Sequence, residues 1–332
     1  MKVLRVLAVT ILLLAIGSGA VAFWWLNRPL ELAADSVEVS VELGTLPREI
    51  AQAWVQAGVQ ASPVLLYEWF RWSGQARQIR AGSYEIGRGV TPVALLNKMV
   101  RGDETLAAVR LIEGWTFRQF RAELARADSL KPATAEMTDA EIMVAIGAPP
   151  AQSPEGRFHP DTYAYSKGSS DVAVLRRAYA AMHKRLDAAW AERAADTPLQ
   201  TRDDALVLAS IVEKETGIGA DRGKVAGVFS NRLRINMPLQ TDPTVIYGLG
   251  TAFDGNLRKR DLLADTPYNT YLRGGLPPTP IAMPGKAALL AAVRPDSTKA
   301  LYFVARGDGS SEFSETLAEH NRAVNQFQRK KP

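Results

Sequence analysis

The first part of the chain is a continuous apolar run, unlike the mixed pattern that follows it. Residues 6–26 include no charged side chain, and as a helix these 21 positions would be about 30 Å long, the thickness of a bilayer core. Lys2 and Arg5 precede the run and favour a cytoplasmic N-terminus. Trp24 and Trp25 close it, as aromatic residues often do at a membrane interface. The pattern therefore predicts a transmembrane helix.

A cleaved signal peptide is the alternative interpretation of this run. Ala20-Val21-Ala22 has the small residues of a cleavage site and follows a short apolar stretch. The apolar run continues past this site, which favours an uncleaved anchor within residues 1–30. Both interpretations export the rest of the chain. With the anchor retained, we expect a single-pass protein of the cytoplasmic (inner) membrane whose larger part lies on the periplasmic side.

Strand and helix patterns alternate after the anchor, which is typical of an α+β protein. A polar linker occupies residues 31–36, and residues 37–43 then alternate β-branched and polar side chains, a strand signal. Helical spacing follows over three segments, residues 46–57, 62–72 and 91–101. Residues 37–104 are therefore predicted to form a small α+β subdomain.

The remaining residues, 105–332, combine long helical patterns with loops rich in Pro and Gly. An amphipathic helix is predicted over residues 171–195, an apolar helix over residues 201–216 and a strand over residues 301–305. The predicted fold class is thus α+β, with one N-terminal transmembrane helix, the small subdomain and a larger mixed α+β domain.

The helix predicted over residues 201–216 is apolar nearly all round, yet it ends with Glu213 and Glu215. The two acids lie about 200° apart around the helix and cannot face one cleft as a pair. Glu215 has the more apolar neighbours, and desolvation near the negative helix end raises a carboxyl pKa, as a general acid requires. Glu215 is therefore the predicted acid and Glu213 a candidate supporting acid. The alternative is that both acids are solvated, with Glu215 paired to Lys214 and Arg222.

Two long turn-rich segments, residues 239–248 and 266–281, mix Tyr, Asn, Thr and Gln with Pro and Gly. Loops of this kind often carry binding or catalysis, and these side chains suit a ligand with apolar faces and many hydroxyl groups, such as a sugar chain. The predicted substrate-binding residues are Gln240, Thr241, Asp242, Tyr247, Tyr268 and Asn269. A rigid Pro-rich surface turn without a ligand is the alternative.

The amino-acid composition excludes several kinds of catalytic and metal-binding site. The chain has no cysteine, which excludes disulfides, zinc–thiolate sites, iron–sulfur clusters and thiol nucleophiles. Its three histidines lie far apart and no metal-ligating or phosphate-binding motif occurs, so we expect no metal and no cofactor. The net charge is +5, and three of the basic residues lie in the anchor segment, which contains no acid. This charge gives no reason to expect nucleic acid as a partner.

Three strings of residues together resemble one family, the membrane-anchored endolytic murein transglycosylases (MltG, or YceG-like). They are Ala209-Ser-Ile-Val-Glu-Lys-Glu-Thr, Leu239-Gln-Thr-Asp-Pro-Thr-Val-Ile-Tyr-Gly and Gly275-Leu-Pro-Pro-Thr-Pro-Ile. The resemblance implies a LysM-like subdomain over residues 37–104, a catalytic domain over residues 105–332, and Glu215 as the acid. Arg157 and His159 depart from the family pattern, and their role stays open.

The resemblance also implies a reaction and partners. The family cleaves the β-1,4 bond after N-acetylmuramic acid inside nascent peptidoglycan strands, leaves a 1,6-anhydro end, and is linked to ending strand growth beside the peptidoglycan synthases. Two rival functions remain open at this point. One is a lysozyme-like hydrolase with Asp242 as its second carboxylate, and the other is an anchored glycan-binding scaffold in which Glu215 is structural.

Overall fold

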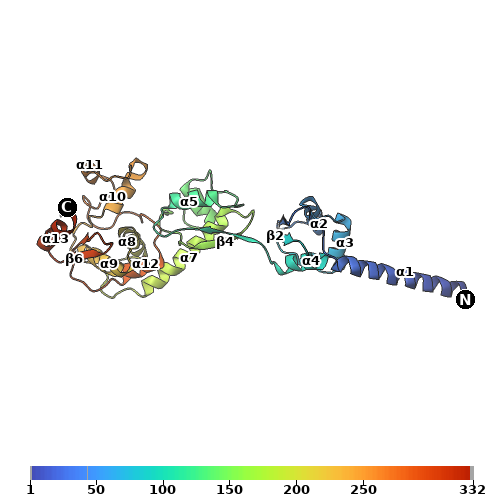
Figure 1. Ribbon diagram of the computed structural model, residues 1–332. Coiled ribbons are helices and arrows are strands. Elements are labelled where there is room, and N and C mark those ends of the chain that lie inside the picture. Colours follow the sequence, from blue (N-terminus) through green and yellow to red (C-terminus); the bar gives the residue numbers. More distant parts are fainter. Residues whose placement is uncertain (1, 43, 330–332) are drawn as a thin grey trace. The chain divides into compact units, whose positions relative to one another are not determined.

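The structure is a computed structural model that describes residues 2–42 and 44–329 (Figure 1). Leu43, the last residue of the strand predicted at 37–43, lies outside the described residues, as do the two ends of the chain. The chain divides into an N-terminal unit and a C-terminal unit. The N-terminal unit comprises Met1–Ala107, Asp128–Leu130 and Ala164–Ser169, and the C-terminal unit comprises Ala108–Ala127, Lys131–Tyr163 and Ser170–Pro332.

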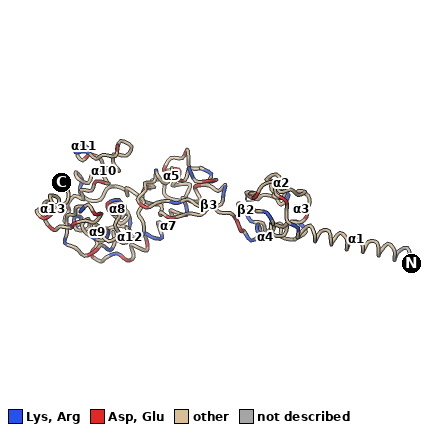
Figure 2. The backbone as a smooth tube through the Cα atoms, in the orientation of Figure 1, with Lys and Arg blue, Asp and Glu red and all other residues tan. Residues whose placement is uncertain are grey.

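Helix α1 (Lys2–Asn27) is the apolar run that opens the sequence. Its segment Val9–Asn27 is long and apolar enough to cross a membrane, and none of it is buried inside the protein. Figure 2 draws this helix tan over nearly its whole length because charged residues are absent from it after Arg5. Length and composition of this kind suit an anchor and a signal sequence alike.

The rest of the N-terminal unit packs three helices against a two-stranded sheet. Strands β1 (Ser36–Val41) and β2 (Gly82–Gly87) pair antiparallel, with Val39 opposite Tyr84. The helices are α2 (Pro47–Gln56), α3 (Pro63–Trp72) and α4 (Pro92–Arg101), with a 3-10 turn η1 (Ala76–Gln78). Every second residue of β1 is buried, and these side chains meet Trp54 and Phe70, which are fully buried, in one core.

The C-terminal unit is mostly helical. Its helices are α5 (Phe117–Arg126), α6 (Asp139–Ile146), α7 (Asp171–Ala191), α8 (Arg202–Glu215), α9 (Gly219–Arg234), α10 (Asp242–Leu249), α11 (Lys259–Leu262), α12 (Lys286–Val293) and α13 (Leu317–Val324), with the short turns η2 (Gly250–Ala252) and η3 (Asn325–Arg329). Strands β5 (Tyr302–Ala305) and β6 (Ser311–Ser314) form an antiparallel hairpin. Strands β3 (Leu106–Arg110) and β4 (Thr162–Ser166) pair in a further sheet, and each runs across the division between the units.

Helix α8 is the centre of the C-terminal unit. All eight residues from 205 to 212 are buried, and the helix packs against α7, α9, α10 and α12. This agrees with the all-round apolar pattern of its sequence, because a helix with no polar face has to lie inside. The predicted α+β class, with a single apolar N-terminal helix and small sheets, is confirmed.

Several helices around α8 are not evident from the sequence pattern. Segment 239–248 was expected as a loop around a Pro turn, yet Asp242–Leu249 forms α10 with Pro243 in its first turn, where a missing N–H costs nothing. Helices α9 and α12 were not predicted either. In α9 the charged residues Asp221 and Arg232 lie among the buried residues, and α12 is apolar throughout after Lys286, so neither sequence has the amphipathic period that marks a surface helix.

Candidate active site

Local sequence fixes where helix α8 begins and ends. The Thr201 hydroxyl accepts the backbone N–H of Asp204, and the Asp204 carboxylate in return accepts the N–H of Thr201. This reciprocal capping box satisfies N–H groups that a helix N-terminus leaves free. Fourteen residues later the helix ends at Glu215, three positions after the last residue of its buried stretch, Val212.

The carboxyl group of Glu215 is largely buried, and its hydrogen-bond partner is an uncharged hydroxyl. The Thr241 hydroxyl donates to its Oε2 at 2.7 Å. Burial is the largest influence and raises the pKa of Glu215, and the negative charge of Asp242 raises it further. The Thr241 hydrogen bond and the positive charge of Arg232 act in the opposite direction but do not prevail. Glu215 thus keeps its proton to higher pH than an ordinary glutamate, which is the property required of a general acid.

Glu213 has a different environment on the other side of α8. The backbone N–H of Gly285 donates to its Oε2 at 2.8 Å, and the Arg222 guanidinium lies 3.7 Å from its Oε1. Lys214 donates instead to the carbonyl of Gly114. The alternative in which Glu215 pairs with Lys214 and Arg222 is therefore wrong, because α9 brings Arg222 to the Glu213 side of the helix. Glu213 holds the chain that enters α12.

The two turn-rich segments are hydrogen-bonded to each other next to Thr241, the residue that contacts Glu215. The backbone N–H of Gln240 donates to the Thr270 carbonyl, and that of Thr241 donates to the Thr270 hydroxyl, both at 3.1 Å. Thr244 and Thr270 share a further hydroxyl contact at 2.9 Å. Gln240 has a positive φ of 48°, which turns the chain so that the Thr241 hydroxyl faces the carboxyl of Glu215.

The predicted substrate-binding residues differ in how much ligand they could reach. Gln240 and Asp242 are exposed, Tyr247 and Tyr268 are partly buried, and Thr241 is buried. Asn269 is completely buried, and its amide group donates to two backbone carbonyls that precede its own segment, those of Leu262 at the end of α11 and Ala264. It has no surface left for a ligand, so we assign Asn269 to positioning the loop.

Each of the two segments contributes one tyrosine, Tyr247 and Tyr268, to a pair of packed rings that is called the tyrosine wall here. The rings of Tyr247 and Tyr268 meet edge to face with centroids 4.8 Å apart. Each hydroxyl is held, because Tyr247 donates to Glu155 at 3.2 Å and Tyr268 lies 2.8 Å from the Thr279 hydroxyl. Two rings fixed in this way present flat apolar surface with polar edges, which suits the faces of a sugar ring.

Glu155 is a further functional candidate, which was not predicted from the sequence. Its side chain accepts the backbone N–H of Phe117 as well as the Tyr247 hydroxyl. Burial raises its pKa to about 7. The contact with Tyr247 joins residues 92 positions apart, so only the folded chain brings them together. No local sequence feature marks Glu155, because residues 154–163 also contain Asp161 and basic side chains.

The two residues that depart from the family pattern are structural here. Arg157 makes two hydrogen bonds of 2.9 Å to the carboxylate of Asp203, in the first turn of α8. His159 is buried, and desolvation lowers its pKa to about 4, so its imidazole is neutral at neutral pH. Arg157 therefore fastens this loop to the start of the helix that carries Glu215.

Burial of Glu155 makes the stability of the protein depend on pH. The ordinary carboxyl pKa is 4.5 and the folded value is about 7, so the folded state binds more protons than the unfolded state between these values. The free energy of unfolding therefore falls as pH rises from about 4.5 to about 7, by roughly 3 kcal/mol for this group alone. We expect Glu155→Gln to remove that part of the fall. Urea unfolding of both proteins at several pH values measures the difference, and parallel curves for the two would contradict this account.

A desolvated carboxyl between hydroxyl-bearing loops and a tyrosine wall is an arrangement that suits a carbohydrate-active enzyme working by acid catalysis. The chain belongs to the YceG-like family, whose model matches residues 39–326. This confirms the family predicted from the three strings of residues.

Proteins from several bacteria are similar to this chain over most of its length. The chain is 30% identical over 308 residues to a protein of Bacillus subtilis named endolytic murein transglycosylase, covering 88% of this chain and 85% of that one. It is 26% identical over 320 residues to a protein of the same name from Streptococcus pneumoniae, of which it spans only 58%. A crystal structure of a YceG-like protein from Listeria monocytogenes aligns over 87% of this chain and 98% of that one, with a TM-score of 0.55 and 26% identity.

Proposed function

We propose that this chain is an endolytic murein transglycosylase, which cuts β-1,4 bonds after N-acetylmuramic acid inside peptidoglycan glycan strands. The observation that supports it most is the position of Glu215, a desolvated carboxyl at the end of α8 whose hydrogen-bond partner is the neutral Thr241 hydroxyl. The names of the Bacillus and Streptococcus relatives agree with this assignment.

The reaction uses one carboxyl twice. Protonated Glu215 donates its proton to the glycosidic oxygen while the bond from that oxygen to C1 of N-acetylmuramic acid breaks, and positive charge develops at C1. The Glu215 carboxylate then takes the proton of the C6 hydroxyl of the same sugar, and O6 bonds to C1. The proton count balances, no water is consumed, and the product carries a 1,6-anhydro ring.

The loops around Glu215 have separate tasks in this proposal. Exposed Gln240 and the tyrosine wall of Tyr247 and Tyr268 hold the sugar chain. Thr241 orients the Glu215 carboxyl through its hydrogen bond of 2.7 Å. Orientation of this kind matters because the C6 hydroxyl must reach C1 before water does.

A hydrolase would need a second carboxylate to attack C1 or to activate water. Asp242 is the candidate, but its Oδ1 already accepts the hydroxyl of Tyr271 at 2.6 Å. Its charge raises the pKa of Glu215. We therefore assign Asp242 to keeping Glu215 protonated, which is a task that a transglycosylase also requires.

The proposed function includes a membrane anchor. Helix α1 stays in the cytoplasmic membrane as a single span, and the remainder of the chain lies on the periplasmic side. Residues 37–104 act as a LysM-like subdomain and residues 105–332 as the catalytic domain. An enzyme held in this way meets glycan strands as membrane-bound synthases release them, so that each cut ends the growth of a strand.

The hydrogen bond from Thr241 gives a test of the acid. Replacement by Val keeps the shape and removes the donor, and because that bond favours the charged form, its loss raises the pKa of Glu215 further. In Thr241→Val we expect kcat/KM to fall roughly tenfold through lost orientation, the effect of about one hydrogen bond. We also expect the alkaline limb of the pH–rate profile to move to higher pH.

Thr241→Ser keeps the hydroxyl and is the matched control. It should retain the wild-type pH profile. An alkaline limb that moves to lower pH in Thr241→Val, or one that moves equally in both variants, would contradict the role of Glu215 as the acid.

A further inference from the structure

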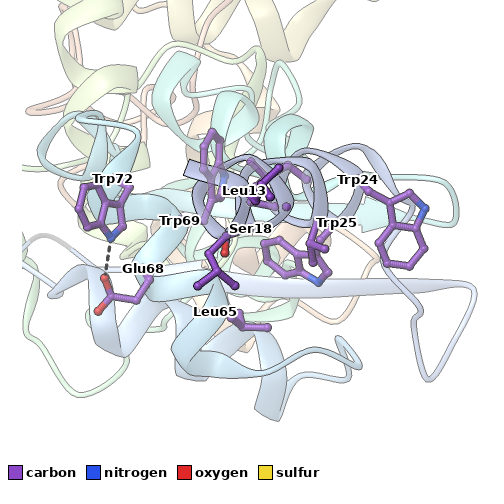
Figure 3. A pocket seen from close by; sticks show the side chains of 13 residues that line it. Leu13, Ser18, Trp24, Trp25, Leu65, Glu68, Trp69 and Trp72 are labelled. Atoms are coloured by element: carbon purple, nitrogen blue, oxygen red, sulfur yellow. Dashed lines mark hydrogen bonds between the residues drawn. The ribbon is translucent and has the colours of Figure 1, made fainter. Parts of the chain in front are cut away.

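An apolar groove of about 800 Å³ runs between α1 and α3 in the N-terminal unit (Figure 3). On the α1 side it is bordered by residues from Leu13 to Leu26, and on the α3 side by Leu65, Trp69 and Trp72. Its only charged lining residue among those described is Glu68. The proposed activity makes no use of this groove.

At the edge of the groove, helix α3 exposes apolar side chains whose contact with water is unfavourable. Leu65 is 52% exposed and Trp72 is 76% exposed, although α3 packs its opposite side firmly into the core through Leu66 and Phe70. Exposed apolar surface that gathers in one place marks a contact with a partner or a membrane.

The two indole N–H groups that α3 brings to the groove are already hydrogen-bonded within the protein. The indole N–H of Trp72 donates to the Glu68 carboxylate at 3.1 Å, which is the dashed line in Figure 3, and that of Trp69 donates to the Pro92 carbonyl at 3.1 Å. Neither indole N–H therefore needs water. Both rings can face hydrocarbon without leaving a donor unpaired.

The position of the groove along α1 indicates which molecules fill it. The bordering residues of α1, from 13 to 26, rise about 20 Å along the helix, out of about 30 Å of bilayer hydrocarbon. If α1 spans the membrane as proposed above, on which this inference rests, most of the groove opens at the depth of the acyl chains in the leaflet nearest the rest of the protein. Arg28 stacks over Trp24, and Arg71 stacks over Trp72, so cations accompany the aromatic rings as at a membrane interface.

We propose that this groove binds acyl chains of the bilayer, and that α3 lies with its Leu65 and Trp72 side in the outer part of the membrane. The N-terminal unit is then seated on the membrane by two helices, one spanning and one interfacial. Apolar area of this kind gains free energy when lipid replaces water beside it.

The absence of cysteine allows a direct test with single nitroxide labels on the full chain in liposomes. Leu65→Cys reports the groove, and Leu14→Cys reports the span. Leu46→Cys is the matched control, because Leu46 is 61% exposed in the same unit and does not line the groove. We expect the Leu65 label, like the Leu14 label, to collide several-fold more with dissolved oxygen than with a water-soluble nickel chelate, and the Leu46 label to show the reverse.

Each other outcome overturns the inference in an identifiable way. Nickel access at Leu65 equal to that at Leu46, with Leu14 protected, leaves the anchor in place and removes the lipid contact. Nickel access at Leu14 removes the anchor and the inference together. Spin–spin coupling between Leu65 labels of two molecules means that a second copy fills the groove. Peptidoglycan digestion by the same variants is read separately, so a failure of the proposed activity is not mistaken for a failure of lipid contact.

Discussion

Glu215→Gln should lower turnover of peptidoglycan by about 10²–10⁴-fold while the protein stays folded and still binds glycan. The carboxamide has the size of the carboxyl and can still accept the Thr241 hydroxyl, but it cannot protonate the leaving oxygen. Since the proposed mechanism uses Glu215 as acid and then as base, no other group replaces it. Fragment release from purified peptidoglycan measures turnover, and co-sedimentation with insoluble glycan measures binding.

Glu213→Gln is the matched control for this result. Its amide oxygen can still accept the Gly285 N–H, while the ion pair with Arg222 is lost, so we expect a loss of stability with little change in turnover per folded molecule. If the Glu213 variant lost as much activity as the Glu215 variant, Glu213 would be a working acid. If Glu215→Gln kept its turnover, the enzyme would use another carboxyl. If the unchanged protein bound glycan but released no fragments, the chain would be a scaffold.

Gly156→Ala should have the largest effect on stability among substitutions near the site. Gly156 has a φ of +78°, and a Cβ added there would lie 2.4 Å from Cβ of Pro280, a ring that cannot rotate away. We expect a loss of about 2–5 kcal/mol in the free energy of unfolding, from backbone strain and overpacking together. Because Glu155 is the adjacent residue, its contact with Tyr247 should loosen as well, and KM for glycan should rise.

Gly147→Ala separates the two causes. Gly147 also has a positive φ, +86°, but a Cβ there would meet no atom within 4 Å. It should lose only about 1–2 kcal/mol, the cost of the left-handed backbone. Urea unfolding of both variants measures the difference, and equal losses would show that the contact between Gly156 and Pro280 has no importance for stability.

The helix that carries the proposed acid could be predicted from the sequence, but the contacts around that acid could not. Helix α8 was predictable because the capping pair Thr201 and Asp204 and the unbroken apolar stretch are local features. Its buried character made Glu215 stand out. The pKa direction also follows from this, because desolvation is the largest influence on Glu215.

The contacts of the acids were not predictable in the same way. Arg222 was the candidate partner of Glu215, but the packing of α9 against α8 decides which side of the helix Arg222 reaches, and it reaches Glu213. Thr241 was expected to contact sugar, whereas its hydroxyl is bonded to Glu215 across 26 positions of sequence. Asn269 is a good turn former in any protein, and burial alone reveals that its amide serves the loop.

In the N-terminal unit, too, local structure was predictable and distant contacts were not. The strand and helices of residues 37–104 were predictable because the strand alternates and the helices are amphipathic, and each pattern states which side faces the core. That two later segments, Asp128–Leu130 and Ala164–Ser169, join this unit follows from contacts distant in sequence and from no pattern in it.

The central claim is that Glu215 cuts glycan without water, and the measurement that tests it most directly is mass spectrometry of fragments released in water labelled with heavy oxygen. The account predicts fragments lighter than hydrolysis products by one water, with no heavy oxygen at the new end, and their absence with Glu215→Gln. Fragments with a reducing end that carries heavy oxygen would contradict it and make the protein a hydrolase.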